Sequence, residues 1–190
     1  EIERTGVSAK FVPTEKQRTD DKNRLIDEKQ ANEIAQFCKD KQATIVSAET
    51  TEKTTPPPLP YNLIKLQQDC SKKFGLNPSK TLEITQSLRE KHQLITYNRS
   101  DCQYLSDEQH LDAASVLQCI SANLTNLTNA VQSSDAKMKG RVFDSSKVSA
   151  HHAIIPSENV VDFSKLTKDE KNVYELIAVS YIAQFYPDYR

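Results

Sequence analysis

The pattern of apolar and polar positions predicts a mainly α-helical chain. Apolar residues recur three or four positions apart, which places them on one helical face, in five segments: 27–41, 63–74, 78–91, 106–120 and 167–186. Gly75 predicts the end of the second helix, and Asn77 before Pro78 predicts the start of the third. Thr167 and Glu170 form the capping-box pattern that opens the last helix. The polar stretch 121–147 predicts a loop with short helical turns.

Extended segments near the N-terminus predict a small α+β element in front of these helices. Residues 4–12 alternate weakly, and the β-branched run 43–54 follows the first helix, so we expect a strand–helix–strand unit over residues 1–54. Three consecutive prolines in 54–60 lack N–H groups and fix φ, so they cannot lie in a helix or a central strand. We therefore expect a domain boundary there, followed by a helical domain over residues 55–190.

The composition excludes several classes of site. The 25 Lys and Arg residues balance 26 Asp and Glu residues, so no strongly basic nucleic-acid coat is present. The three glycines are never close together, which excludes dinucleotide fingerprints and P-loops. No apolar run is long enough to span a membrane, and no signal sequence is visible, so we expect no membrane partner. Because the chain begins at Glu1 and its one methionine is Met138, we expect an internal fragment of a longer protein.

The cysteines predict neither a metal site nor a disulfide framework. None of the four forms a C-x-x-C pair, so a zinc ribbon is not expected. We expect reduced thiols in a cytoplasmic protein. Carboxylates with the spacing of a metal site are also not evident, so no metal ligand is assigned in this chain. The cysteines are Cys38, Cys70, Cys102 and Cys119.

Positive charge is concentrated in one part of the chain. The segment from position 65 to position 99 contains seven basic and three acidic residues. Lys65, Lys72 and Lys73 are candidates for contacts to a phosphate backbone. The alternative is an ordinary solvated helical face.

A tyrosine and an arginine two positions apart suggest phosphate chemistry. In the extended segment predicted for 94–100, Tyr97 and Arg99 would project to the same side and could share one phosphate. The guanidinium would bind the phosphate oxygens and favour the phenolate, whereas stacking at a surface is the alternative. His151 and His152 are adjacent, so they are poor joint metal ligands. Either histidine could donate to a phosphate oxygen or be structural.

Three segments in a fixed order resemble type IA DNA topoisomerases. Residues 57–76 resemble the entry to their active-site domain, residues 80–106 the segment that ends in their catalytic tyrosine, and residues 148–157 their histidine motif in the form typical of the topoisomerase III branch. The resemblance extends from about residue 55 to the chain end. Residues 1–54 resemble the neighbouring arch domain more loosely, and the last residues would lead back to it.

The resemblance implies a mechanism. Tyr97 would attack single-stranded DNA to give a 5′-phosphotyrosyl link and a free 3′-hydroxyl, and resealing after strand passage would need no ATP. Arg99 would stabilise the scissile phosphate, and His151 would bind a phosphate oxygen. Ser100 and His152 are further expected DNA contacts.

The resemblance also implies which partners the chain needs. Family members bind Mg²⁺ through carboxylates of a Toprim domain, which these residues do not supply. We therefore expect a monomer that acts together with the Toprim and arch domains of the same polypeptide, and a fragment that is inactive alone.

Three alternatives use the same residues differently. A helix–turn–helix module would bind duplex DNA through the helix at 78–91 and would not need Tyr97. A tyrosine recombinase is disfavoured, because its nucleophile follows its arginine and histidine residues in the chain, whereas Tyr97 precedes Arg99 and His151. The third alternative is a structural or interaction domain without chemistry.

Overall fold

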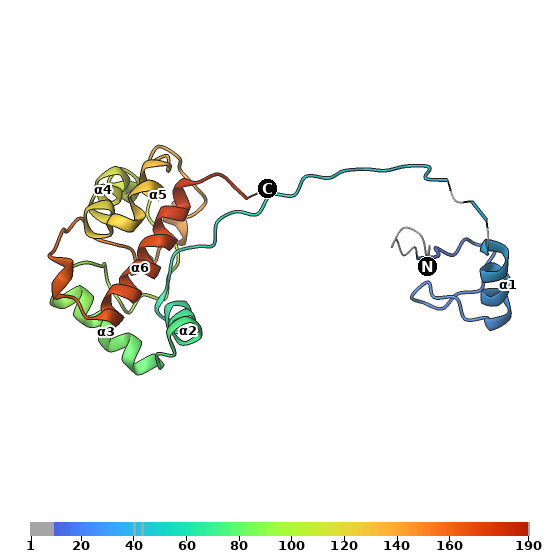
Figure 1. The fold of residues 1–190 in the computed structure, drawn as a ribbon, viewed down its shortest axis with the longest axis horizontal. Helices are drawn as coiled ribbons and strands as arrows, with labels where there is room; N and C mark the ends of the chain where they lie inside the picture. Colours follow the sequence, from blue (N-terminus) through green and yellow to red (C-terminus); the bar gives the residue numbers. More distant parts are fainter. Residues whose placement is uncertain (1–9, 40, 43, 190) are drawn as a thin grey trace. The chain divides into compact units, whose positions relative to one another are not determined.

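The computed structural model describes residues 10–39, 41–42 and 44–189, which divide into two compact units, Glu1–Thr51 and Glu52–Arg190 (Figure 1). Helices make up most of the regular structure of the described residues, where β pairing is limited to isolated bridges. The prediction of a mainly α-helical chain is therefore confirmed. None of the helices in the described part is long and apolar enough to cross a membrane.

Within its described residues the first unit contains one helix, α1 (Glu28–Cys38), as predicted. The Asp27 side chain caps it by accepting a hydrogen bond from the Gln30 N–H. The strand predicted at 4–12 lies largely outside the described residues, and residues 10–12 have no regular structure.

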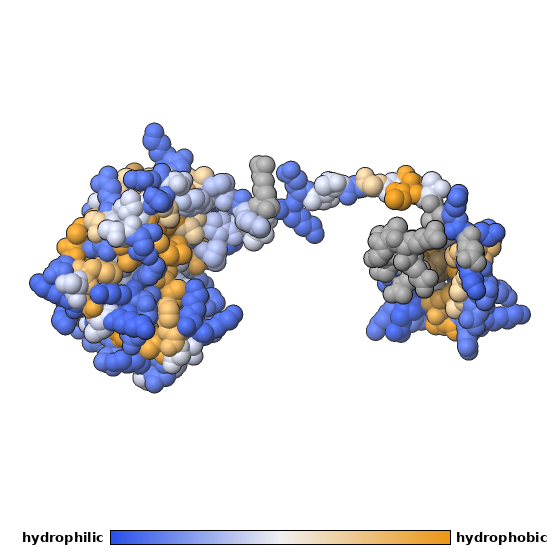
Figure 2. Space-filling view, viewed as in Figure 1, coloured by the Kyte–Doolittle hydropathy of each residue, from blue (hydrophilic) through white to orange (hydrophobic). Residues whose placement is uncertain are grey.

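The strand predicted after α1 is wrong. Residues 44–54 have no regular structure, and Ile45 and Val46 are 84% and 94% exposed. Apolar side chains are visible along this segment in Figure 2. A β-branched run becomes a strand only when another strand pairs with its N–H and C=O groups, and no described segment does so.

Residues 52–189 of the second unit pack five α-helices around a single core. Its helices are α2 (Leu63–Phe74), α3 (Pro78–Glu90), α4 (Ala113–Asn123), α5 (Thr128–Gln132) and α6 (Lys168–Ile182). Helix α3 packs against both α6 and α2 (Figure 1). Tyr174, Ile177 and Tyr181 of α6 are fully buried and form the centre of the core.

The predicted capping residues act as expected. Gly75 ends α2 in the left-handed conformation with φ of 69°. The Asn77 side chain accepts from the Lys80 N–H at the start of α3. Both hydrogen bonds of the Thr167–Glu170 capping box are present at α6.

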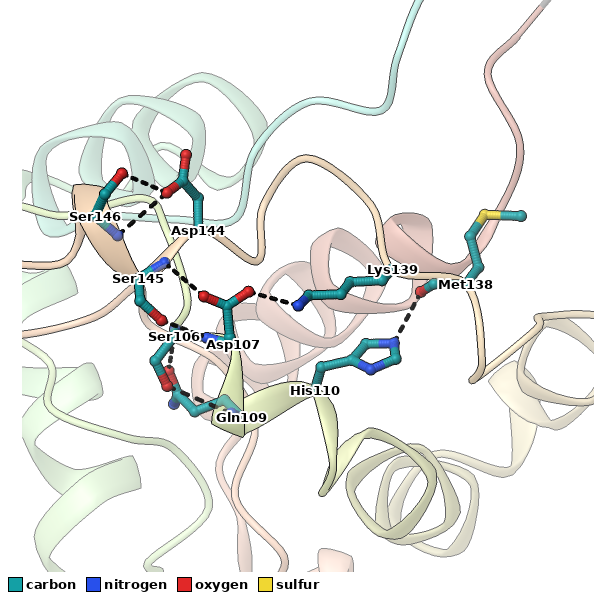
Figure 3. A network of polar contacts seen from close by, with 9 residues as sticks. All are labelled: Ser106, Asp107, Gln109, His110, Met138, Lys139, Asp144, Ser145 and Ser146. Carbon is teal, nitrogen blue, oxygen red and sulfur yellow. Dashed lines mark hydrogen bonds and ion pairs between the residues drawn. The ribbon is translucent and has the colours of Figure 1, made fainter.

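The helix predicted from Ser106 begins later than expected. A short 3₁₀ turn, Glu108–His110, comes first, and α4 starts only at Ala113. Tertiary contacts hold this turn (Figure 3): the Asp107 carboxylate binds Lys139 Nζ, and the Asp107 N–H donates to Ser145 Oγ at 2.8 Å. These contacts hold the turn against residues 138–146, so the turn does not continue directly into α4.

Candidate active site around Tyr97

The segment that carries Tyr97 pairs with the segment that follows His151. The Thr96 N–H donates to the Ile155 carbonyl at 3.0 Å, and the Ser157 N–H donates to the Leu94 carbonyl at 2.9 Å. An antiparallel bridge joins Ile95 to Pro156 between these bonds. Two motifs that are distant in the sequence therefore lie side by side.

Helix α3 and the start of α2 hold the same segment from other directions. Asn98 is buried, and its Nδ2 donates to Thr85 Oγ1 on α3 at 3.2 Å. The Leu94 N–H closes the end of α3 by donating to the Leu88 carbonyl at 2.8 Å. On the far side of Tyr97, the Ser100 carbonyl accepts from the first N–H of α2. The backbone around Tyr97 is thus fixed before and after the residue.

The Tyr97 side chain lies against two other side chains. Its ring centroid is 4.1 Å from that of His151, with the ring planes 34° apart. The guanidinium carbon of Arg89 lies 4.6 Å from the same centroid. Tyr97 is half-buried and His151 is exposed. Within the described part of the chain the Tyr97 hydroxyl makes no hydrogen bond, so its oxygen is not committed to a structural role.

Arg99 adopts a different backbone conformation from the one expected. Asn98 and Arg99 form a turn, so the extended geometry assumed from Tyr97 to Arg99 is not found. The turn arises because Asn98 points into the protein toward Thr85. Arg99 is exposed, and none of the described carboxylates forms an ion pair with it.

The two other predicted neighbours of the site make local hydrogen bonds. Ser100 is 1% exposed, and its Oγ accepts from the Cys102 N–H at 3.1 Å. His152 is half-buried, with Nδ1 2.8 Å from the Ala153 carbonyl oxygen, so this nitrogen donates and Nε2 is left for other partners.

The three predicted lysines lie along α2. Lys65 is near the end that contacts Ser100, and its Nζ is 3.1 Å from Asp69 Oδ1. Burial raises the pKa of Asp69, but hydrogen bonds from Lys65 and Tyr61 outweigh it and hold that pKa below its usual value. Lys72 and Lys73 are in the last turn, about 10 Å further along a helix that rises 1.5 Å per residue. The structure therefore brings Lys65, but not the other two, toward the Tyr97 segment.

Sequence comparison identifies the family. A profile of the DNA topoisomerase family matches residues 4–190. The chain belongs to this family. It is 38% identical over 168 residues to DNA topoisomerase 3 of Vibrio cholerae. The match covers 88% of this chain and 26% of the relative.

Other relatives give the same result. The chain is 36% identical over 172 residues to DNA topoisomerase 3 of Haemophilus influenzae and 37% identical over 170 residues to that of Salmonella typhimurium. In both cases the match covers 89% of this chain and 26% of the relative, so the chain spans about a quarter of their length. Among solved structures, full-length topoisomerase I from Thermotoga maritima matches with a TM-score of 0.48 and 26% identity over 86% of this chain and 26% of that one. The relatives bear the name of the branch that the histidine motif predicted.

Arg89, which contacts Tyr97 in this topoisomerase chain, was not selected as a site residue from the sequence. Arg89 was one of several basic residues on a helix, and nothing in its spacing from Tyr97 marks it. The contact exists only because the chain reverses after α3 and returns along the helix. Its one sequence signal is that Arg89 lies one turn after Thr85 on the same face of α3.

The described residues do not fit the magnesium site expected of the whole enzyme. Among them no group of three or more His, Cys, Asp or Glu side chains is placed to hold a metal ion. No residue described here is therefore assigned as a ligand for Mg²⁺.

Proposed function

We propose that this chain carries the nucleophile of a DNA topoisomerase, and that the nucleophile is Tyr97. The observation that supports this most strongly is the juxtaposition of Tyr97 and His151, whose rings lie 4.1 Å apart on two paired segments. A phenol with an uncommitted hydroxyl beside an exposed imidazole is suited to receive a phosphodiester. Family membership makes DNA the expected substrate.

In the proposed reaction, Tyr97 Oη attacks the phosphorus of a phosphodiester in single-stranded DNA. The Oη–P bond forms, the P–O3′ bond breaks, the phenolic proton is lost and the 3′ oxygen gains a proton. The product is a 5′-phosphotyrosyl link and a free 3′-hydroxyl. Because one phosphodiester replaces another, the reverse reaction reseals the strand without ATP after strand passage.

The neighbouring residues have separate roles in this proposal. His151 donates a hydrogen bond to a non-bridging phosphate oxygen, and Arg99 supplies positive charge from its exposed turn. Such donors stabilise charge that develops on the phosphate in the transition state. His152, through Nε2, and Lys65 contact flanking phosphates, with Lys72 and Lys73 farther along the strand. Ser100 contributes by holding the turn, since its side chain is buried.

The reaction needs parts of the polypeptide beyond the residues described here. We propose that Mg²⁺ is bound by a Toprim domain of the same monomer, and that the enzyme works in the cytoplasm, where bacterial DNA is found. The residues described here would bind DNA but would not relax it alone.

Cleavage by the full-length protein tests this proposal. The protein is mixed with Mg²⁺ and a 3′-labelled single-stranded oligonucleotide, and denaturant-resistant adducts are separated. We expect an adduct with the native protein and with Tyr189→Phe, which alters an 81% exposed tyrosine, but not with Tyr97→Phe. An adduct that persists in Tyr97→Phe would contradict the proposal.

A further inference from the structure

Besides His151, the Tyr97 ring contacts Arg89. This arginine lies in the last turn of α3 and is half-buried, with its guanidinium carbon 4.6 Å from the ring centroid. A guanidinium within about 6 Å of an aromatic face is attracted by the π electrons of the ring. The contact therefore links a rigid helix to the proposed nucleophile.

Helix α3 contacts two successive residues of the loop that carries Tyr97. Thr85 and Arg89 are four residues apart, so they lie on the same face of α3. Thr85 accepts a hydrogen bond from the buried Asn98, and Arg89 covers the ring of the preceding residue, Tyr97. The Leu88–Leu94 backbone hydrogen bond fixes the turn between helix and loop. The fold therefore fixes the position of Arg89, which is not a freely moving side chain on the surface.

The charge of Arg89 is not neutralised by a neighbouring carboxylate. Across residues 10–39, 41–42 and 44–189 no ion pair involves Arg89. The adjacent Glu90 instead accepts hydrogen bonds from Gln86 Nε2, at 3.2 Å to each carboxylate oxygen. The full positive charge of Arg89 is therefore available to Tyr97.

We propose that Arg89 is a positioning residue for Tyr97, one that holds the ring in its reactive place and sets a positive charge beside it. This inference rests on the proposed function. Once its proton is lost, the phenol oxygen carries negative charge until the Oη–P bond is complete, and it becomes negative again when it leaves during resealing. A fixed cation beside the ring stabilises that charge in both directions.

Two substitutions separate the charge of Arg89 from its bulk. Arg89→Met keeps an apolar stem of similar length but loses the cation, whereas Arg89→Lys keeps the cation. In single-turnover cleavage by the full-length protein, we expect Arg89→Met to be about tenfold slower, equivalent to about 1.4 kcal/mol of barrier. Arg89→Lys should recover most of the rate.

Two controls distinguish positioning from DNA binding and from loss of one positive charge. The Kd for the oligonucleotide, measured in a Tyr97→Phe background, should change less than twofold on Arg89→Met. Lys80→Met removes a charge from the same helix, where Lys80 pairs with Glu83 at 3.0 Å, and should leave the cleavage rate unchanged.

A spectroscopic measurement on the 190-residue chain tests the contact without any cleavage. The side-chain protons of Arg89 should show an upfield ring-current shift in their NMR spectrum. The shift should persist in Tyr97→Phe, which keeps a ring, and disappear in Tyr97→Leu.

The possible results are distinguishable. An unchanged cleavage rate in Arg89→Met, or the absence of the ring-current shift, would overturn the role of Arg89 while the proposed function stands. A slower rate with an equal weakening of Kd would make Arg89 a DNA contact and would also overturn positioning. If the native protein forms no adduct, the proposed function fails and the role of Arg89 fails with it, a result visible before any change at position 89.

Discussion

Tyr97 and His151 have ring centroids 4.1 Å apart because their two segments pair through backbone hydrogen bonds. Thr96 is bonded to the histidine segment through both its backbone N–H and its hydroxyl. The geometry of the proposed site thus depends on backbone contacts that side-chain substitutions at Tyr97 or His151 leave in place. This makes both residues suitable for mutational tests.

We expect His151→Ala to slow cleavage by about 10- to 100-fold, since one donor to the developing phosphate charge is lost. His151 is exposed, so the substitution should leave the thermal midpoint of unfolding nearly unchanged. Single-turnover cleavage and thermal unfolding of the same variant check this. A native cleavage rate would exclude His151 from the transition state.

The buried hydrogen bond between Asn98 and Thr85 should contribute to stability. Asn98→Ala removes the donor while Thr85 Oγ1 keeps its own hydrogen bond to the Leu82 carbonyl, so we expect a loss of about 1 kcal/mol in the free energy of unfolding. A double-mutant cycle with Thr85→Val should give a coupling energy of about 1 kcal/mol. A coupling energy near zero would show that this bond does not hold the Tyr97 segment to α3.

Glu170 should make stability depend on pH in the acid range. Burial raises its pKa, but hydrogen bonds from Ser87 and Thr167 outweigh this and lower the pKa to about 2, from an ordinary value of 4.5. His92 Nε2, 3.4 Å away, favours the same ionised form when protonated. The unfolded chain therefore takes up the proton first as pH falls.

Stabilisation by Glu170 is fully present above about pH 4.5 and is lost as pH falls toward about 2, up to about 3 kcal/mol in total. Urea unfolding between pH 6 and pH 2 measures this, with Glu170→Gln as the comparison. The variant should be less stable at pH 6 and have a flatter profile. Parallel profiles for the two proteins would assign the acid sensitivity to other groups.

Gly75 should tolerate few replacements. Its φ of 69° is strained for residues with a Cβ, although no atom lies within 4 Å of an added Cβ. We expect Gly75→Ala to cost about 1 kcal/mol of folding free energy and Gly75→Asn to cost less. Denaturant unfolding of both variants tests the order, and an equal cost would contradict the assignment of the cost to the left-handed backbone conformation.

The sequence predicts those features that depend on local interactions. The caps at Asn77, Gly75 and Thr167 formed as expected, because each cap satisfies backbone groups only a few residues away. The start of α4 was misplaced since Asp107 binds Lys139 and Ser145, which no local pattern reveals. The strand predicted over 43–54 is not found in its described residues, 44–54, for the same reason, since a strand needs a second strand to pair with.

The sequence predicted the residues of the candidate site better than it predicted their arrangement. Tyr97 and His151 were selected through resemblance to a family, and the distance between them required the fold. We expected an extended segment with the Tyr97 and Arg99 side chains on the same side. The sequence did not reveal that Asn98 turns inward to Thr85. Arg89 was not found, because its contact arises where a helix and a returning loop meet.

The role of Tyr97 is tested most directly by identifying the residue that becomes linked to DNA. The full-length protein is allowed to cleave a single-stranded oligonucleotide with Mg²⁺, the adduct is denatured and digested, and the nucleotide-bearing peptide is sequenced by mass spectrometry. We predict a 5′-phosphate ester on Tyr97. A nucleotide found on any other residue would contradict it.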